Sequence, residues 1–297
     1  MPPRQPAVES FRAPPRRPGP ATAIEAYAAA LDAGLQQITD AAAGLAQDDP
    51  AAQAEQVHQL RVGIRRLRTA LRSFRGCAPA PAAPLVEALR TLFAELGRVR
   101  DASAAGTDIA AELARAGAPP SALLRGDAGP DPVRLVQAAA TQATLRAWTD
   151  WRATLAVAPP GAAGAPTWRR KLGRRLGRWH AGIVGDCLSF DALDDAALHA
   201  LRKRIKRQRY AVEFLAAGLR QRPLGAYLGA LAEAQDRMGR LNDLFVARAR
   251  YQALPKSEPG AWFALGWLAA QIAQARQHAE PALARLAQTP APTAFRP

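Results

Sequence analysis

The sequence contains little cysteine. Its 297 residues include only Cys77 and Cys187, which stand far apart. Neither belongs to a C-x-x-C pair, so the spacing typical of a zinc site is missing. Two distant cysteines also do not make the disulfide framework of a small secreted domain. We interpret both as small buried thiols and predict a cytoplasmic protein with no metal and no cofactor.

Long hydrophobic runs are also missing. The most apolar run is AWFALGWLAA at 261–270, whereas a membrane-spanning helix needs about 20 such residues. The first 20 residues are rich in proline and arginine and lack the apolar segment of a secretion signal. The sequence therefore predicts no membrane insertion and a disordered arm at 1–20.

Residues that favour β-strands are scarce, because alanine, leucine and arginine dominate and aromatic residues make up 6% of the chain. No segment shows the sustained alternation of a strand, so we predict essentially no sheet. Apolar residues at helical spacing, separated by turn sequences such as CAPAPAAP, predict an all-α fold. The expected helices cover residues 21–46, 52–76, 84–116, 131–157, 166–186, 194–219, 223–253 and 259–288.

Acidic residues are outnumbered, with 25 Asp and Glu against 40 Lys and Arg and a net charge of +15 at pH 7. Apolar residues still make up 49% of the chain, as in a globular protein. A folded protein with this charge implies a polyanionic partner, such as nucleic acid, an acidic membrane surface or a phosphate polymer.

The chain does contain an internal repeat. His58-x-x-Arg61 returns 141 positions later as His199-x-x-Arg202, and LGRVRD at 96–101 returns 142 positions later as MGRLND. We therefore predict two four-helix bundles related by an internal pseudo-twofold. The predicted organisation is an arm at 1–20, a first four-helix half at 21–158, a linker at 159–166, a second four-helix half at 167–289 and a tail at 290–297.

A basic row lies beside the apolar stripe in each copy of the repeated helix, at about 100° per residue. The first row contains no acid, so its like charges repel, and a bound anion would remove that penalty. The alternative is a solvated basic face that acids from other helices partly neutralise. The rows are His58, Arg61, Arg65, Arg68 and Arg72 in the first copy, and His199, Arg202, Lys206 and Arg209 in the second.

A third basic cluster, TWRRKLGRRLGRWH at 167–180, opens the second half. We interpret it as a third wall of the same anion site, with a solvent-facing patch as the alternative. Arginine suits phosphate because its planar fork donates two hydrogen bonds and stays charged. The cluster comprises Arg170, Lys171, Arg174, Arg175 and Arg178.

The motifs H-x-x-R-x-x-x-R-R-x-R at 58–68 and H-x-x-R-K-R-x-K-R-x-R-Y at 199–210, each followed by an LGR-x-x-D-type segment, resemble the CHAD family, the conserved-histidine α-helical domain. The resemblance covers about residues 21–288. It implies two four-helix bundles that bind inorganic polyphosphate along a basic surface or pore between the halves, and association with polyphosphate granules. By motif position it implies binding by His58, Arg61, Arg65, Arg68, His199, Arg202, Lys206 and Arg209. Charge and helix phase add Arg72, Arg98, Arg240 and the 170–178 cluster.

Two positions depart from the repeat. Glu213 stands where the first copy has Arg72, and Asn242 stands where it has Arg100. The two halves therefore need not contribute equally. Some family members carry a fused triphosphatase domain with an ExExK strand. No such sequence occurs here, so we do not carry over their catalytic activity.

Two other functions stay open at this point. A nonspecific nucleic-acid-binding protein would use the same charge, although Tyr210 is the only aromatic residue near the polar side of either row. We expect at most weak nucleic-acid binding. A phosphoryl-transfer enzyme would need clustered carboxylates or a P-loop, and GxxxxGK[ST] is missing. We interpret Asp191, Asp194 and Asp195 as a helix cap and predict a non-catalytic polyphosphate-binding module.

Overall fold

The computed structural model describes residues 22–47, 49–103, 107–119, 130–155, 165–219, 221–254 and 258–293. Within these residues, ten α-helices and one 3-10 helix form, no β-strand forms, and Arg75 and Ala78 make an isolated bridge. The predicted all-α fold is therefore confirmed. The α-helices are α1 (Ala23–Gly44), α2 (Pro50–Phe74), α3 (Ala83–Ser103), α4 (Thr107–Arg115), α5 (Pro132–Gln137), α6 (Ala139–Thr154), α7 (Ala165–Leu188), α8 (Asp195–Leu215), α9 (Gln221–Gln252) and α10 (Pro259–Gln288).

Local sequence explains where the two basic helices begin. Asp49 caps α2 by accepting hydrogen bonds from the backbone of Ala51 and Ala52, and Pro50 occupies the first turn. Asp194 caps α8 by accepting from the backbone of Ala197 at 2.8 Å. The interpretation of Asp194 as a cap is confirmed.

Two expected helices are divided in the structure. The predicted helix 84–116 consists of α3 and α4, with residues 104–106 outside the described part. The predicted helix 131–157 is interrupted at Ala138, whose backbone is extended at φ −55° and ψ 137°. Gln142 donates to the carbonyl of Val136 at 2.9 Å, so a side chain binds the last turn of α5.

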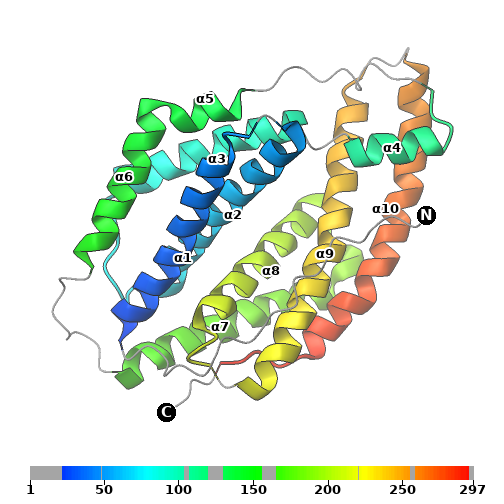
Figure 1. Cartoon of the computed structure of the whole chain (residues 1–297). Coiled ribbons are helices and arrows are strands. Elements are labelled where there is room, and N and C mark those ends of the chain that lie inside the picture. The colour runs from blue at the N-terminus through cyan, green and yellow to red at the C-terminus, as the bar shows by residue number, and fades with distance from the viewer. Residues whose placement is uncertain are drawn as a thin grey trace.

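The helices form two groups, one of α1, α2, α3, α5 and α6 and one of α7 to α10 (Figure 1). α1 packs along α2 in the first group, and α9 packs along α10 in the second. α2 also contacts α8, so the two repeated helices meet between the groups. α4 follows the first group in sequence but lies beside α9 (Figure 1). The pseudo-twofold relation stays a prediction.

The apolar stripes of α2 and α8 form part of the core. Leu60, Ile64, Leu201 and Ile205 are all at most 1% exposed, which leaves the adjacent basic rows at the edge of the core. The predicted arm at 1–20 and residues 159–164 of the predicted linker lie outside the described residues. None of the described helices is long and apolar enough to span a membrane.

Candidate functional site

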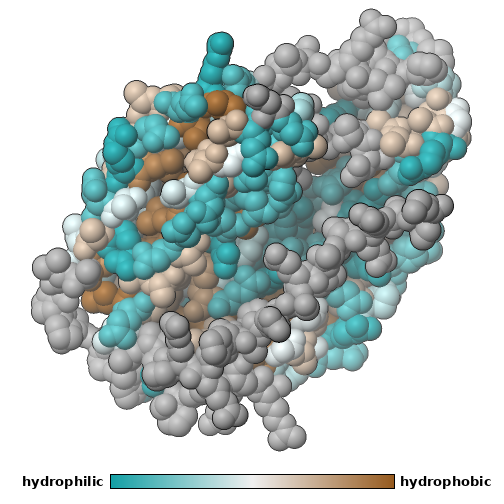
Figure 2. All heavy atoms as spheres, in the orientation of Figure 1, coloured by the Kyte–Doolittle hydropathy of each residue, from teal (hydrophilic) through white to brown (hydrophobic). Residues whose placement is uncertain are grey.

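A cleft of about 1030 Å³ lies between the two groups of helices. In the space-filling view, hydrophilic residues line the hollow between the groups (Figure 2). Its described lining contains nine Arg and Lys residues and two His residues against three acidic ones. The basic residues are His58, Arg61, Arg65, Arg68, Arg72, His199, Arg202, Lys203, Lys206, Arg207 and Arg240, and the acids are Glu55, Asp195 and Asp243.

The α2 wall contains the whole predicted row, from His58 to Arg72. Three of its arginines surround the ring of Phe93, a residue of α3 that also lines the cleft. The guanidinium carbons of Arg61, Arg68 and Arg65 lie 4.4, 5.3 and 5.7 Å from the ring centroid. Nη1 of Arg61 also donates a hydrogen bond to the carbonyl of Phe93 at 2.9 Å.

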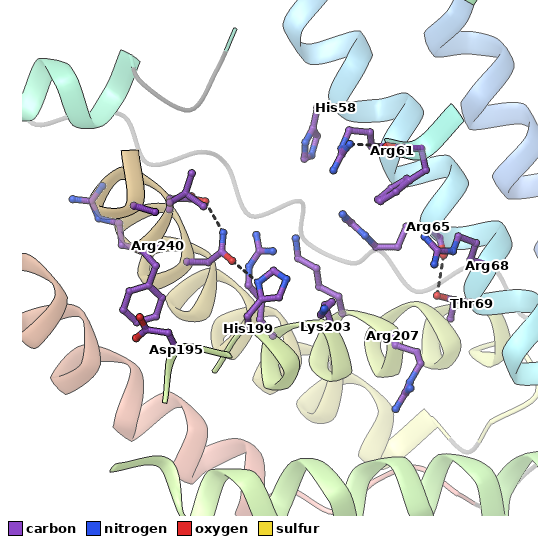
Figure 3. Close-up of a pocket in the computed structure, with 18 of the residues that line it drawn as sticks. His58, Arg61, Arg65, Arg68, Thr69, Asp195, His199, Lys203, Arg207 and Arg240 are labelled. Atoms are coloured by element: carbon purple, nitrogen blue, oxygen red, sulfur yellow. Dashed lines mark hydrogen bonds between the residues drawn. The ribbon is translucent and has the colours of Figure 1, made fainter. Parts of the chain in front are cut away.

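The α8 wall contains His199, Arg202 and Lys206 from the predicted row, and also Lys203 and Arg207. Figure 3 shows His199, Lys203 and Arg207 on α8, across from the labelled residues of α2. Sequence reasoning missed Lys203 and Arg207 as ligand candidates. Their helical phase was the available signal, because Lys203 lies only about 40° from His199 on the wheel.

Both walls of the cleft thus come from the two copies of one sequence motif. The model of the CHAD domain family matches residues 29–252 of the chain. The chain belongs to the CHAD domain family. This finding confirms the resemblance that the motifs at 58–68 and 199–210 indicated.

Solved structures agree with this assignment. The CHAD domain from the plant Ricinus communis is 28% identical, with a TM-score of 0.74, over 97% of this chain and 100% of that one. PptA from Streptomyces chartreusis is 19% identical, with a TM-score of 0.60, over 92% of this chain and 99% of that one, and so shares the fold. A comparison with curated proteins found no match.

Like charges face one another inside the cleft of this CHAD domain. Burial, followed by repulsion from Arg72, Arg90 and Arg65, lowers the pKa of Arg68. Burial, followed by repulsion from Arg72 and Arg204, lowers the pKa of Arg207 on the other wall. Arg72 therefore repels a cation on each wall, and an anion bound between them would relieve that repulsion.

His199 of the α8 wall is held by Asn242, the residue that replaces Arg100 of the first copy. Nδ1 of His199 donates to Oδ1 of Asn242 at 2.8 Å, because an amide oxygen can only accept (Figure 3). Nδ2 of Asn242 in turn donates to Asp243 at 3.4 Å. The side chain of Arg100, the residue aligned with Asn242, lies outside the described part of the chain.

The three acids gather at the N-terminal ends of the basic helices. Glu55 precedes His58 by three residues, and Asp195 precedes His199 by four. Asp243 is the residue after Asn242, which binds His199. Asp195 is paired with Arg248 of α9. The arginines at 68, 72 and 207 lie toward the C-terminal ends. The described lining is therefore most positive at that end of the CHAD cleft.

Arg240 lines the cleft but already has an acidic partner. Its guanidinium is 2.5 Å from the carboxylate of Glu112, which belongs to α4. This ion pair joins the short helix α4 to α9 across the boundary between the two groups. A polyanion in the cleft would compete with Glu112 for Arg240.

The remaining predicted residues lie outside the cleft lining. Arg209 binds Glu213 of its own helix at 2.8 Å, and Arg98 is 3.8 Å from Glu95 with its side chain 70% exposed. On α7, Arg175 donates to the backbone carbonyls of Arg72, Ser73 and Arg75, and so caps the end of α2. The other cluster members, Arg170, Lys171, Arg174 and Arg178, are exposed.

The described residues contain no group of three or more His, Cys, Asp or Glu side chains placed to hold a metal ion.

Proposed function

We propose that this CHAD domain binds inorganic polyphosphate in the cleft between α2 and α8, without catalysis. The observation that carries the proposal is the pairing of two basic rows, each headed by a histidine, on opposite walls of one cleft. Polyphosphate carries about one charge per phosphate, and arginine can donate two hydrogen bonds to one phosphate group. The family's general association with polyphosphate supports the same reading.

Single-stranded nucleic acid is the second candidate, because the charge of the cleft suits any polyanion. Sequence-tolerant binding of single strands depends on aromatic rings on which bases can stack. Three guanidinium groups surround the ring of Phe93, and Arg248 lies 5.1 Å from the ring centroid of Phe245. Both aromatic residues in the described lining of the cleft thus already contact cations, which favours polyphosphate.

The test is a titration with long-chain polyphosphate at near-physiological salt, with single-stranded DNA of matched charge as competitor. The double variant Arg65→Ala/Lys206→Ala removes one aligned cation from each wall. We expect it to weaken polyphosphate binding by about 100-fold or more, because a hydrogen bond to a charged group contributes about 1.5–3 kcal/mol.

Arg134→Ala/Arg146→Ala is the matched control, because it removes the same charge from exposed positions on α5 and α6, outside the cleft. Equal losses in both double variants, or full displacement by DNA, would mean that only diffuse charge binds the polymer. Gel analysis of the polyphosphate after incubation tests for chain cleavage, which we expect to be undetectable.

Association with polyphosphate granules is part of the proposal. In cells that contain granules, a fluorescent fusion of the wild-type chain should collect on them, and Arg65→Ala/Lys206→Ala should stay diffuse. Granule binding by the double variant would separate localisation from the cleft.

A further inference from the structure

The ring of Phe93 has three cations within contact distance. Its three partners, Arg61, Arg65 and Arg68, are consecutive members of the α2 row. The ring thus touches the central part of the wall rather than a single side chain. Attraction between the ring face and the guanidinium groups offsets part of their mutual repulsion.

Contact with the ring restricts side chains that would otherwise be mobile. A mobile arginine side chain loses conformational entropy when it binds a ligand, and this loss weakens the affinity. Arg61 is held twice, by the ring face and by the carbonyl of Phe93. A guanidinium that stacks on a ring keeps N–H groups at its edge for phosphate. The wall is therefore arranged before the ligand arrives.

Gly97 makes this arrangement possible. A Cβ atom at residue 97 would lie 2.7 Å from Nη1 of Arg61, closer than side chains tolerate. The aligned glycine of the second copy, Gly239, has nothing within 4 Å of the same position. The glycine of the repeated L/M-G-R segment therefore makes room for an arginine in the first half only.

We propose that Phe93 and Gly97 are positioning residues that hold Arg61, Arg65 and Arg68 as a preordered phosphate-binding subsite. This inference rests on the proposed function. We expect the α2 wall to bind polyphosphate more tightly because one ring orders three of its arginines, whereas on the α8 wall Arg207 lies 4.3 Å from the ring centroid of Trp179. Phe93 acts through the arginines, and removing its ring changes no charge.

The experiment compares Phe93→Leu, Phe93→Tyr and Gly97→Ala with the wild type by calorimetric titration with polyphosphate at several salt concentrations. We expect Phe93→Leu to bind about tenfold more weakly with an unchanged salt dependence, because the number of cations is the same. Phe93→Tyr keeps the ring and should bind like the wild type. Gly97→Ala displaces Arg61 and should weaken binding to a similar extent as Phe93→Leu.

Phe214→Leu is the matched control. Arg66 lies 5.6 Å from the centroid of Phe214, and neither residue lines the cleft. This variant loses a cation–ring contact of the same kind and should bind polyphosphate normally. A second readout needs no ligand: the NMR signals of arginine Nε–Hε groups should show faster exchange in Phe93→Leu than in the wild type.

The outcomes separate the two proposals. The positioning role would be overturned if Phe93→Leu bound polyphosphate with wild-type affinity. It would also be overturned if Phe214→Leu or Phe93→Tyr lost as much affinity as Phe93→Leu. None of these results would exclude polyphosphate binding in the cleft. A wild-type protein that does not bind polyphosphate would overturn the proposed function instead. In that case the arginine NMR signals would still show whether Phe93 orders the row.

Discussion

α2 and α8 carry the same motif, but they present different side chains to the cleft. The α2 row enters it through His58 and four arginines, three of which surround Phe93. On the α8 wall, Arg209 lies outside the cleft lining, and Lys203 and Arg207 line the cleft. Two of the five basic residues of this wall are therefore lysines. A lysine is a flexible point charge, whereas a restrained arginine offers a fixed hydrogen-bonding fork. The two copies of the motif therefore place similar positive charge on both walls of the cleft, but they do not place the same side chains in the same arrangement.

The comparison predicts unequal losses from aligned substitutions. Arg65 and Lys206 occupy the same position in the two copies, and both line the cleft. Arg65→Ala should weaken polyphosphate binding about 30-fold and Lys206→Ala about fivefold, because a restrained bidentate donor contributes more than a point charge. Titration of the two single variants at one salt concentration measures the difference. Equal losses would mean that the two walls contribute equally to the affinity for polyphosphate.

Freeing a cleft arginine from its acid should strengthen binding. Glu112→Gln removes the partner of Arg240, a half-exposed pair that contributes about 1 kcal/mol, so polyphosphate affinity should rise about fivefold. Glu95→Gln is the control, because it releases the aligned Arg98, which lies outside the cleft lining. The same gain in both variants would indicate a general charge effect.

The aligned positions 72 and 213 should separate binding from stability. Glu213 accepts from Arg209 at 2.8 Å and lies 4.0 Å from Arg66 of α2, with its side chain 18% exposed. Glu213→Gln should lower the free energy of unfolding by about 1 kcal/mol and leave polyphosphate binding nearly unchanged. Arg72→Ala should weaken binding and change unfolding by less than about 0.5 kcal/mol.

Urea unfolding and titration of both variants check this separation. A loss of affinity in Glu213→Gln as large as that in Arg72→Ala would show that the Glu213 pair also shapes the cleft.

A third basic helix tests whether the cleft has two walls or three. Arg174 and Arg178 are exposed on α7 and do not line the cleft. Arg174→Ala/Arg178→Ala should weaken polyphosphate binding only about twofold, through diffuse attraction that salt screens. Titration at low and high salt measures it. A loss above about tenfold at high salt would make α7 a third wall, as the charge pattern of 167–180 predicted.

Several features followed from local sequence alone. Helical periodicity predicted the all-α fold, because the 3.6-residue repeat of apolar side chains depends only on neighbours along the chain. The same periodicity placed His58, Arg61, Arg65, Arg68 and Arg72 on one face, and all of them line the cleft. The caps Asp49 and Asp194 also act within a few residues of their own position.

Tertiary structure decided which of the basic side chains meet. Arg209 has the right helical phase, but Glu213 of its own helix binds it outside the cleft lining. Lys203 and Arg207 line the cleft instead, because on the helical wheel of α8 the lining residues lie on both sides of His199, whereas Arg209 lies beside the apolar stripe. Phe93, Gly97 and Glu112 become relevant only through contacts between helices. Helical phase is set by local geometry, whereas partners across a cleft depend on how distant helices pack.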